Sequence, residues 1–151
     1  MFRFSRRLMS AVEAVVDIAY HSGDGLVQSV EITRRQGIPR RYLEQVLQRL
    51  VRSGILAGVR GPRGGYRLAR ERRRITMGDI MRVVRDMDQS AEDEALADGS
   101  DISKQVIRPI WDELEKTCTD RLDSVTIEDL CREARTAGIE AERQPPADFV
   151  I

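Results

Sequence analysis

The chain has few residues of the kinds that support metal sites or disulfide-rich folds. Its two cysteines, Cys118 and Cys131, are too few for a disulfide scaffold and favour a reducing compartment. His21 is its only histidine, so no second imidazole is present to build a histidine-based metal site. We expect His21 to be exposed or to cap the helix end at which it lies. The sequence therefore predicts no metal centre.

The chain also lacks a long apolar stretch. No segment approaches the roughly 18 consecutive apolar residues that cross a bilayer. The apolar run near the N-terminus is interrupted by Glu13 and Asp17, which argues against a secretory signal. We therefore expect a cytoplasmic protein with no membrane partner.

Motifs for catalysis are missing as well. The glycine-rich segment at residues 61–65 lacks the Lys-Ser/Thr pair of a phosphate-binding loop and lies between two strand candidates rather than before a helix. The acidic residues Asp112, Glu113 and Glu115 fit a solvated helix face better than an acid–base pair. The sequence therefore predicts a protein that is not an enzyme.

Lysine is absent from the first 74 residues, and the charge of the chain is divided along its length. Residues 1–74 hold 16 arginines and 6 acidic residues, a net charge of +10, whereas residues 75–151 hold 9 basic and 19 acidic residues, a net charge of −10. An arginine-rich half suits a polyanion, because the guanidinium fork binds phosphate and guanine well. A solvated basic face on an ordinary soluble protein is the alternative.

The first half contains short amphipathic segments in a recognisable order. The pattern predicts helices at residues 5–20, 29–36 and 39–53 and strands at residues 56–59 and 66–68. Ser5 and Ser29 are expected as helix caps, and Pro39 in a first helical turn. Two short helices followed by a hairpin predict a winged helix-turn-helix, in a fold that is mostly α with a small β-hairpin.

The second half is predicted to be helical and more acidic. Helices are expected at residues 76–87, 102–122 and 127–137, with Thr76 and Thr126 as caps. Pro109 predicts that the long helix either starts or bends there. We therefore divide the chain into a winged helix-turn-helix domain (1–87), an acidic, mobile loop (88–101), a long helix with a C-terminal helix (102–137) and a frayed tail (138–151).

The third helix is the candidate for reading DNA in the major groove. Its outward side chains mix arginine, acid and amide groups, which can pair with guanine, cytosine and adenine edges, respectively. They are Arg40, Arg41, Glu44, Gln45 and Gln48. The candidates for contacts to phosphate are Ser29, Arg34, Arg35, Arg40, Arg49, Arg52 and, as a residue shared with the core, Tyr42. The alternative is that these are solvated polar positions of an exposed helix.

The turn of the hairpin is the second candidate for contact with DNA. It carries little bulk and several charges, from the consecutive residues Arg60, Gly61, Pro62, Arg63 and Gly64. A narrow loop that presents guanidinium groups suits the minor groove, where the negative potential is strongest. An ordinary basic surface hairpin is the alternative.

These segments resemble the bacterial regulator family that includes IscR, NsrR and CymR. The most specific part is Arg-Gly-Pro-X-Gly-Gly-Tyr-X-Leu at residues 60–68, following Tyr-Leu-Glu-Gln at residues 42–45. Further matching positions are residues 29–38, 53–55, 75–80, Trp111 and residues 125–130. The resemblance covers roughly residues 1–137 and implies a DNA-binding transcription regulator, usually a repressor.

The resemblance also implies a homodimer on double-stranded DNA. A long helix from each subunit crosses its mate in such proteins, and here that helix is residues 102–122. Its apolar side supplies the expected dimer contacts, which are Val106, Ile110, Trp111, Leu114, Cys118 and Leu122. Members of this family read DNA through the positions that match Arg41, Glu44 and Gln45 on the helix and Arg60 and Gly61 on the wing.

The chain departs from the cluster-binding members of this family. They carry three cysteines before the dimer helix, where this chain has acidic residues instead. Some add a histidine at the position that aligns with Arg108. Because a [2Fe–2S] site needs four good ligands, we expect no iron–sulfur cofactor. A thiol or cluster sensor that uses Cys118 and Cys131 across a dimer, or a small effector, remains an alternative source of regulation.

A protein of another class also fits part of the pattern. Winged helices serve as protein-docking modules, and the acidic half could bind a basic partner. Such a module would show only weak DNA affinity that is indifferent to sequence.

Overall fold

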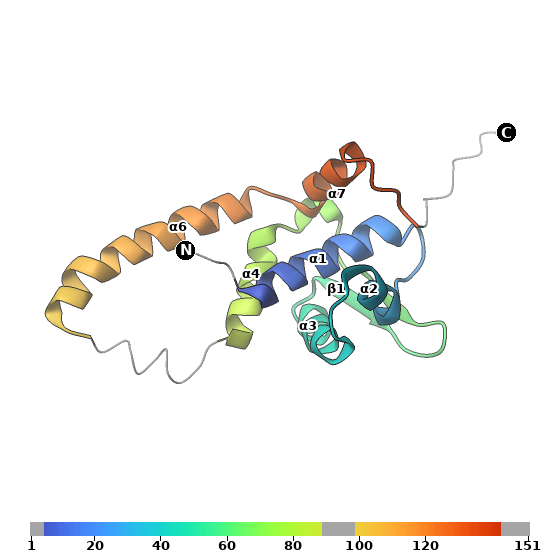
Figure 1. Cartoon of the computed structure of the whole chain (residues 1–151), viewed down its shortest axis with the longest axis horizontal. Coiled ribbons are helices and arrows are strands. Elements are labelled where there is room, and N and C mark those ends of the chain that lie inside the picture. Colours follow the sequence, from blue (N-terminus) through green and yellow to red (C-terminus); the bar gives the residue numbers. More distant parts are fainter. Residues whose placement is uncertain (1–4, 89–98, 143–151) are drawn as a thin grey trace.

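The structure, a computed structural model, describes residues 5–88 and 99–142 (Figure 1). It confirms the expected fold class, which is mostly helical with one two-stranded antiparallel hairpin. The helices and the hairpin gather into a head, from which one long helix extends to the side (Figure 1). The predicted acidic loop lies largely outside the described residues, as does the chain beyond residue 142.

Helix α1 (Arg6–His21) runs through the centre of the head and contacts α2, α3, α4 and α7. It begins as predicted at Ser5, whose Oγ accepts a hydrogen bond from the Leu8 N–H at 3.2 Å. Its inner face is fully buried at Ala11, Val15 and Ile18. Small and β-branched side chains here allow the surrounding helices to approach closely, so α1 organises the core.

Helices α2 (Ser29–Gln36) and α3 (Arg40–Arg52) form the predicted helix-turn-helix. Gly37 ends α2 with a φ of +67°, a conformation that favours glycine. Two predicted boundaries are wrong by one residue. Gln28, not Ser29, occupies the cap position of α2, and Pro39 precedes the first turn of α3 instead of lying within it.

Strands β1 (Leu56–Val59) and β2 (Gly65–Leu68) pair antiparallel, with Leu56 opposite Leu68. Strand β2 starts one residue earlier than predicted. Tyr66 also pairs with Val27, which the sequence did not reveal because the two residues are far apart in the chain. A short 3₁₀ turn, η1 (Arg72–Arg74), follows the hairpin.

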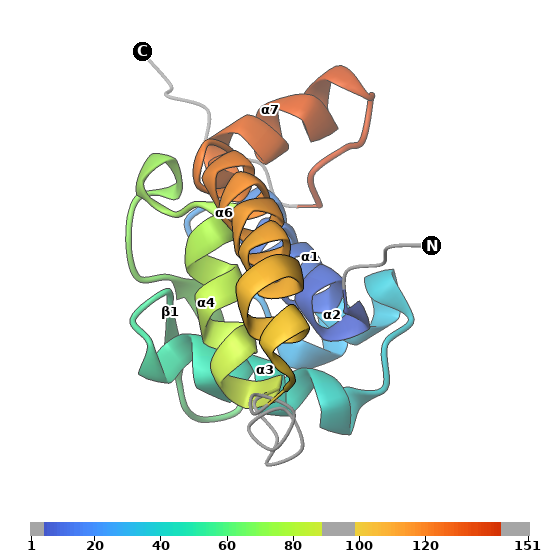
Figure 2. The ribbon, with the colours of Figure 1, turned by 90° about the vertical axis from the view of Figure 1, so that its left-hand side faces the viewer.

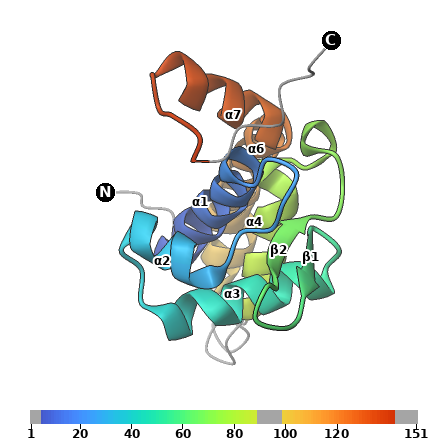
Figure 3. The same cartoon turned by 90° about the vertical axis from the view of Figure 1, so that its right-hand side faces the viewer.

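Helices α4 (Met77–Asp88) and α7 (Ile127–Thr136) begin side by side. Thr76 and Asp79 exchange side-chain and backbone hydrogen bonds at the start of α4, and Thr126 and Asp129 repeat the arrangement at α7. Thr76 and Thr126 form a β-bridge between the two starts. This bridge docks the C-terminal helix on the head, opposite α3 (Figure 3).

Helix α6 (Arg108–Asp123) follows a π-helical turn, η2 (Ser103–Ile107). Pro109 has no N–H to donate to the carbonyl four residues earlier, so an ordinary α-helix is disfavoured here. The Arg108 N–H instead bonds the carbonyl of Ser103, five residues earlier. The α-helical part therefore begins beside Pro109. It lies along α4 (Figure 2), to which the Arg82–Asp123 ion pair at 2.6 Å ties it.

The segment after α7 differs from the predicted frayed tail. The carbonyl of Ile139 accepts a hydrogen bond from the Tyr20 hydroxyl. The Glu142 N–H donates to His21 Nδ1 at 3.0 Å. Residues 138–142 are therefore held against the end of α1.

Candidate nucleic-acid interface

A groove of about 680 Å³ lies between the start of α2, the exposed face of α3 and the hairpin. These elements meet on one side of the head (Figure 3). The groove is lined by Gln28, Ser29, Val30, Arg40, Gln48, Val51, Arg52, Gly58, Val59, Arg60, Gly61, Gly64, Gly65 and Tyr66. The structure therefore brings together seven of the predicted contact residues, namely Ser29, Arg40, Gln48, Arg52, Arg60, Gly61 and Gly64.

The outward face of α3 follows a four-residue spacing. Arg40, Glu44, Gln48 and Arg52 succeed one another at this interval, while Leu43 and its buried neighbours face the core. Arg40 Nε lies 2.9 Å from Glu44 Oε1, so these two charges offset each other in the free protein. An exposed pair of this kind contributes only about 0.3–0.5 kcal/mol, so a base or phosphate can replace it.

The remaining predicted α3 residues lie beside the groove rather than along it. Arg41 and Gln45 are exposed on the same helix. Tyr42 is half-buried against the core, and the Arg7 guanidinium stands 5.8 Å from the centre of its ring. Tyr42 is thus fixed by contacts on both sides, with α1 supplying a cation at its face.

The turn of the wing is tight because two glycines permit it. Gly61 has a φ of +109°, which side chains rarely adopt. A Cβ on Gly64 would lie 2.1 Å from the carbonyl oxygen of Val59, so only glycine fits there. The Gly64 N–H bonds the Gly61 carbonyl at 2.9 Å and closes the turn. Arg60, Pro62 and Arg63 are all exposed at its tip.

Tyr66 lines the groove from strand β2. Its ring covers Gly58, where an added Cβ would stand 3.7 Å from the Tyr66 ring. Burial, together with the negative charge of Glu44, raises the pKa of the Tyr66 phenol. The hydroxyl therefore stays protonated at neutral pH, and strand β2 and helix α3 are electrostatically linked across the groove.

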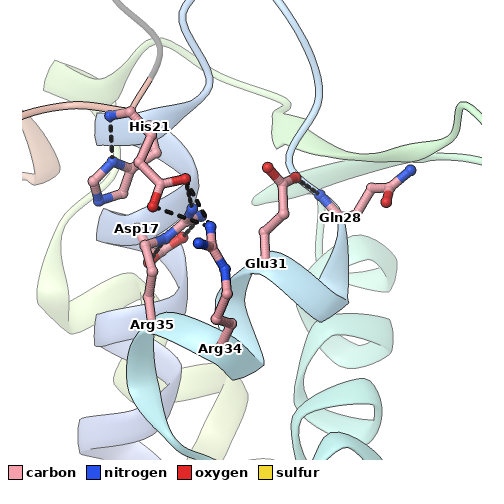
Figure 4. A network of polar contacts seen from close by, with 7 residues as sticks. Asp17, His21, Gln28, Glu31, Arg34 and Arg35 are labelled. Atoms are coloured by element: carbon pink, nitrogen blue, oxygen red, sulfur yellow. Dashed lines mark hydrogen bonds and ion pairs between the residues drawn. The ribbon is translucent and has the colours of Figure 1, made fainter.

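Arg35 lies elsewhere, although it was a candidate for a phosphate contact. Its guanidinium donates to both carboxylate oxygens of Asp17, at 2.8 Å and 2.6 Å (Figure 4). The two side chains are only 14% and 7% exposed. The hydrogen bond that Arg35 donates to Asp17 raises the pKa of Arg35 despite its burial. A guanidinium committed in this way joins α2 to α1, so we assign Arg35 to the framework and not to the interface.

Glu142 extends the same network from the C-terminal segment. Its carboxylate accepts from Arg35 Nη1 at 2.7 Å and from Arg34 Nη2 at 2.9 Å. Burial and the nearby Arg35 charge lower the pKa of His21, whose Nδ1 accepts the Glu142 N–H. The C-terminal segment is thereby attached to the first helix of the helix-turn-helix.

The predicted dimer contacts divide into two groups along η2 and α6. Val106, Ile110, Trp111 and Leu114 are between 46% and 58% exposed. Cys118 and Leu122 are half-buried nearer the head. An apolar side of this size is unusual on a surface that meets only water.

The two thiols are poorly suited to hold a metal cluster. Cys131 is fully buried, and burial raises the pKa of its thiol, whereas a metal ligand has to be a thiolate. Cys118 lies on a different helix and is half-buried. Across residues 5–88 and 99–142, no group of three or more His, Cys, Asp or Glu side chains could hold a metal ion. The described donor set does not fit a [2Fe–2S] cluster.

Comparison with known proteins identifies the family. Residues 4–133 match Rrf2, described as an iron-dependent transcriptional regulator. The chain belongs to the Rrf2 family. It is 35% identical over 123 residues to the HTH-type transcriptional regulator IscR of Photobacterium profundum, which covers 82% of this chain and 72% of that protein. For IscR of Pectobacterium atrosepticum the identity is 32% over 134 residues, covering 89% and 81%.

Solved structures of Rrf2 regulators have the same fold. T. potens IscR superposes with a TM-score of 0.73 at 35% identity, over 90% of each chain. CymR, the global cysteine regulator of B. subtilis, gives 0.68 at 27% identity, over 88% of this chain and 98% of that one. The chain is therefore a winged-helix transcription regulator with DNA as its partner, and its relatives are not enzymes.

Some groove residues of this Rrf2 regulator escaped the sequence prediction. Gln28 and Val30 were missed because the cap of α2 was placed one residue too late. Tyr66 was recognised only as a strand residue, although its place opposite Gly58 in the hairpin could have directed it to the groove. Within the described parts of the chain, no helix has the length and apolar character needed to cross a bilayer.

Proposed function

We propose that the protein acts as a homodimeric repressor that reads a two-fold symmetric operator in double-stranded DNA. Helix α3 enters the major groove, and the wing enters the adjacent minor groove. The observation that carries this proposal is the groove, which joins the polar face of α3 and the arginine-bearing turn on one side of the head. A protein that binds the bacterial chromosome in this way works in the cytoplasm.

Glu44 and Gln45 are the proposed base readers on α3, together with Arg40 and Arg41. Carboxylate, amide and guanidinium groups distinguish base pairs by their major-groove edges. Ser29 and Tyr42 are the proposed phosphate contacts. The position of Ser29 at the start of α2, in the lining of the groove, supports its role. Arg60, Gly61, Pro62, Arg63 and Gly64 form the part that enters the minor groove.

The exposed side of α6 is the proposed dimer interface. Ile110, Trp111 and Leu114 leave the apolar side of this helix uncovered in a single chain. A second copy that presents the same side would bury it through a symmetric contact. Two reading heads would then face half-sites one helical turn or more apart.

We further propose that this regulator works without an iron–sulfur cluster. The buried Cys131 and the absence of cysteines other than Cys118 support this proposal. Regulation then comes from a small effector or from oxidation of the Cys118 thiol. Anaerobically purified protein should be colourless and free of iron, and it should still bind DNA. A visible absorption band with two irons per subunit pair or more would refute the proposal.

Selection of bound fragments from random DNA by the full-length protein tests the function. A palindromic consensus is expected, on which the variant Arg60→Ala should bind about 1–3 kcal/mol more weakly because a groove contact is lost. Arg135→Ala removes an arginine from α7, far from the groove in sequence and outside its lining, and should bind like the wild type.

The rival class, a protein-docking module, predicts a different result. Selection would then enrich no sequence, and the protein would bind all fragments with similar weak affinity that disappears at moderate salt. A monomer at all concentrations in light scattering would contradict the homodimer.

A further inference from the structure

The base of the wing is attached to the chain just before α2 by backbone hydrogen bonds. Val27 and Tyr66 exchange hydrogen bonds in both directions, at 2.9 Å and 2.8 Å. A Cβ on Gly65 would lie 2.7 Å from the Val27 carbonyl oxygen, so the missing side chain allows this close approach. The base of the wing is therefore held beside the start of α2 by two backbone hydrogen bonds and a close approach that glycine permits.

The tip of the wing extends beyond this support. Strands β1 and β2 pair over four residues each, and a hairpin of this size is marginally stable by itself. Arg60, Pro62 and Arg63 lie past the paired residues and are exposed. The position of the tip, which carries both arginines, is thus set by contacts other than strand pairing.

Gln28 provides such a contact. Its side-chain Nε2–H donates to the Pro62 carbonyl oxygen at 3.2 Å, across 34 residues of chain. Gln28 is itself held in place, because its backbone N–H bonds Glu31 Oε2 at 2.7 Å and its carbonyl accepts from Glu31 and Ile32 (Figure 4). A donor with an immobilised backbone therefore reaches the wing tip from the cap of α2.

We propose that Gln28 is a positioning residue that sets where the wing tip stands relative to α3, and thereby how strongly Arg60 and Arg63 discriminate between DNA sequences. This inference rests on the proposed function. A wing and a helix that enter adjacent grooves must stand at a matching separation. Ordering the tip before DNA arrives lowers the entropy lost on binding. Gln28 also lines the groove, so its bond lies between the two reading elements.

The expected effect is modest and confined to the wing. Gln28→Met keeps the length of the side chain and removes its donor. On the selected operator this variant should bind about three- to tenfold more weakly, as the loss of one hydrogen bond predicts. Preference for A·T pairs in the flanks that the wing contacts should fall, while discrimination at the base pairs read by α3 should stay unchanged.

A double-mutant cycle separates positioning from direct contact with DNA. In an Arg60→Ala/Arg63→Ala background the wing has no arginines to position, so Gln28→Met should change affinity by less than about twofold. An undiminished effect in that background would overturn the inference and make Gln28 a DNA contact or a general stabiliser. Gln105→Met makes the same exchange in η2 and should leave the operator affinity unchanged.

Backbone order in the free protein gives a second, independent readout. Gln28→Met should lower the NMR order parameters of Gly61 and Arg63 without DNA, while those of Val27 and Tyr66 at the wing base stay as in the wild type. Unchanged order at the tip would overturn the inference. If the wild type selects no consensus, the proposed function fails. If it does select one and Gln28→Met behaves as the wild type, only the role of Gln28 fails.

Discussion

Apolar side chains are buried in the head of this molecule but exposed on its long helix. In the head, residues such as Val15, Leu43 and Leu47 are fully buried among α1, α3 and their neighbours. In α6 no residue is buried, and the largest apolar side chains, Ile110 and Trp111, are more than half exposed. The head is also the arginine-rich part, whereas the chain after residue 74 carries the excess of acidic residues.

This difference separates folding from assembly. The head has a contiguous core of its own, so its fold requires no second chain. The apolar side of α6 gains its burial only when another surface covers it, and α6 itself is attached to the head by polar bonds such as that between Arg85 and Glu115. We therefore expect substitutions in the head to alter stability and substitutions in α6 to alter association.

Replacing a leucine by alanine in the head is expected to have the largest effect, and the same replacement in α6 gives its counterpart. Leu47→Ala, at a position with no exposure, should lower the free energy of unfolding by about 2–5 kcal/mol because it removes buried methyl groups and leaves a cavity. Leu114→Ala, at a position 46% exposed, should instead raise the dissociation constant of the dimer. Urea unfolding at several protein concentrations, with light scattering, measures both quantities.

Similar behaviour of Leu47→Ala and Leu114→Ala would contradict this difference between the head and α6. A loss for Leu114→Ala that is as large as that of Leu47→Ala and independent of protein concentration would mean that α6 belongs to the core of the single chain. Leu114→Met is the control, since it keeps an apolar side chain of similar volume and should preserve the dimer.

Arg35 and Arg34 provide a second matched pair, within the head. Arg35→Met leaves the nearly buried Asp17 carboxylate without its charged partner, and should lower the free energy of unfolding by roughly 2–4 kcal/mol. Arg34 binds the same Glu142 but is 64% exposed, so Arg34→Met should cost well under about 1 kcal/mol. Thermal unfolding measures both. Equal, small losses would return Arg35 to the list of DNA contacts.

The Arg35 result illustrates what the sequence could and could not predict. Features set by neighbours in the chain were correct, such as the helix caps at Ser5 and Thr76. The wing, with its glycine turn, was predicted for the same reason. The role of Arg35 was not, because its partner Asp17 is 18 residues away and nothing in the local pattern marks it.

Other missed features share this physical cause. The bond from Gln28 to Pro62 and the contacts of residues 138–142 each join segments that are distant in sequence. The local sequence of residues 138–142 gives no sign of these contacts, because their partners lie in α1 and α2. Features that depend on local spacing, such as helix ends, were therefore predicted to within a residue, whereas contacts between distant segments were not. The predicted DNA contacts themselves stay a prediction.

The salt dependence of DNA binding tests whether the arginines of the head, and not those of α6, contact DNA. If each subunit meets three or four phosphates, the plot of log affinity against log salt should have a slope of about −5 to −7 for the dimer. Arg52→Met removes one exposed, groove-lining charge from each head and should reduce the slope by about 2 per dimer. Arg121→Met, on α6, should leave it unchanged. An equal change in the slope for both variants would indicate that DNA also contacts α6.

The smallest expected effect is the pH dependence of the contact between His21 and the C-terminal segment. Burial, followed by the charge of Arg35, lowers the pKa of His21 below its ordinary 6.5, while Asp17, Glu142 and Glu31 act in the opposite direction. Between the lowered value and about 6.5 the unfolded chain binds more protons than the folded one, so stability is lost as the pH falls through this window. Because His21 is the only histidine, His21→Asn, which keeps an acceptor near Nδ1, should remove this loss between pH 7 and pH 5.5 in urea unfolding. Identical pH profiles for the variant and the wild type would show that the contact is not coupled to the ionisation of His21.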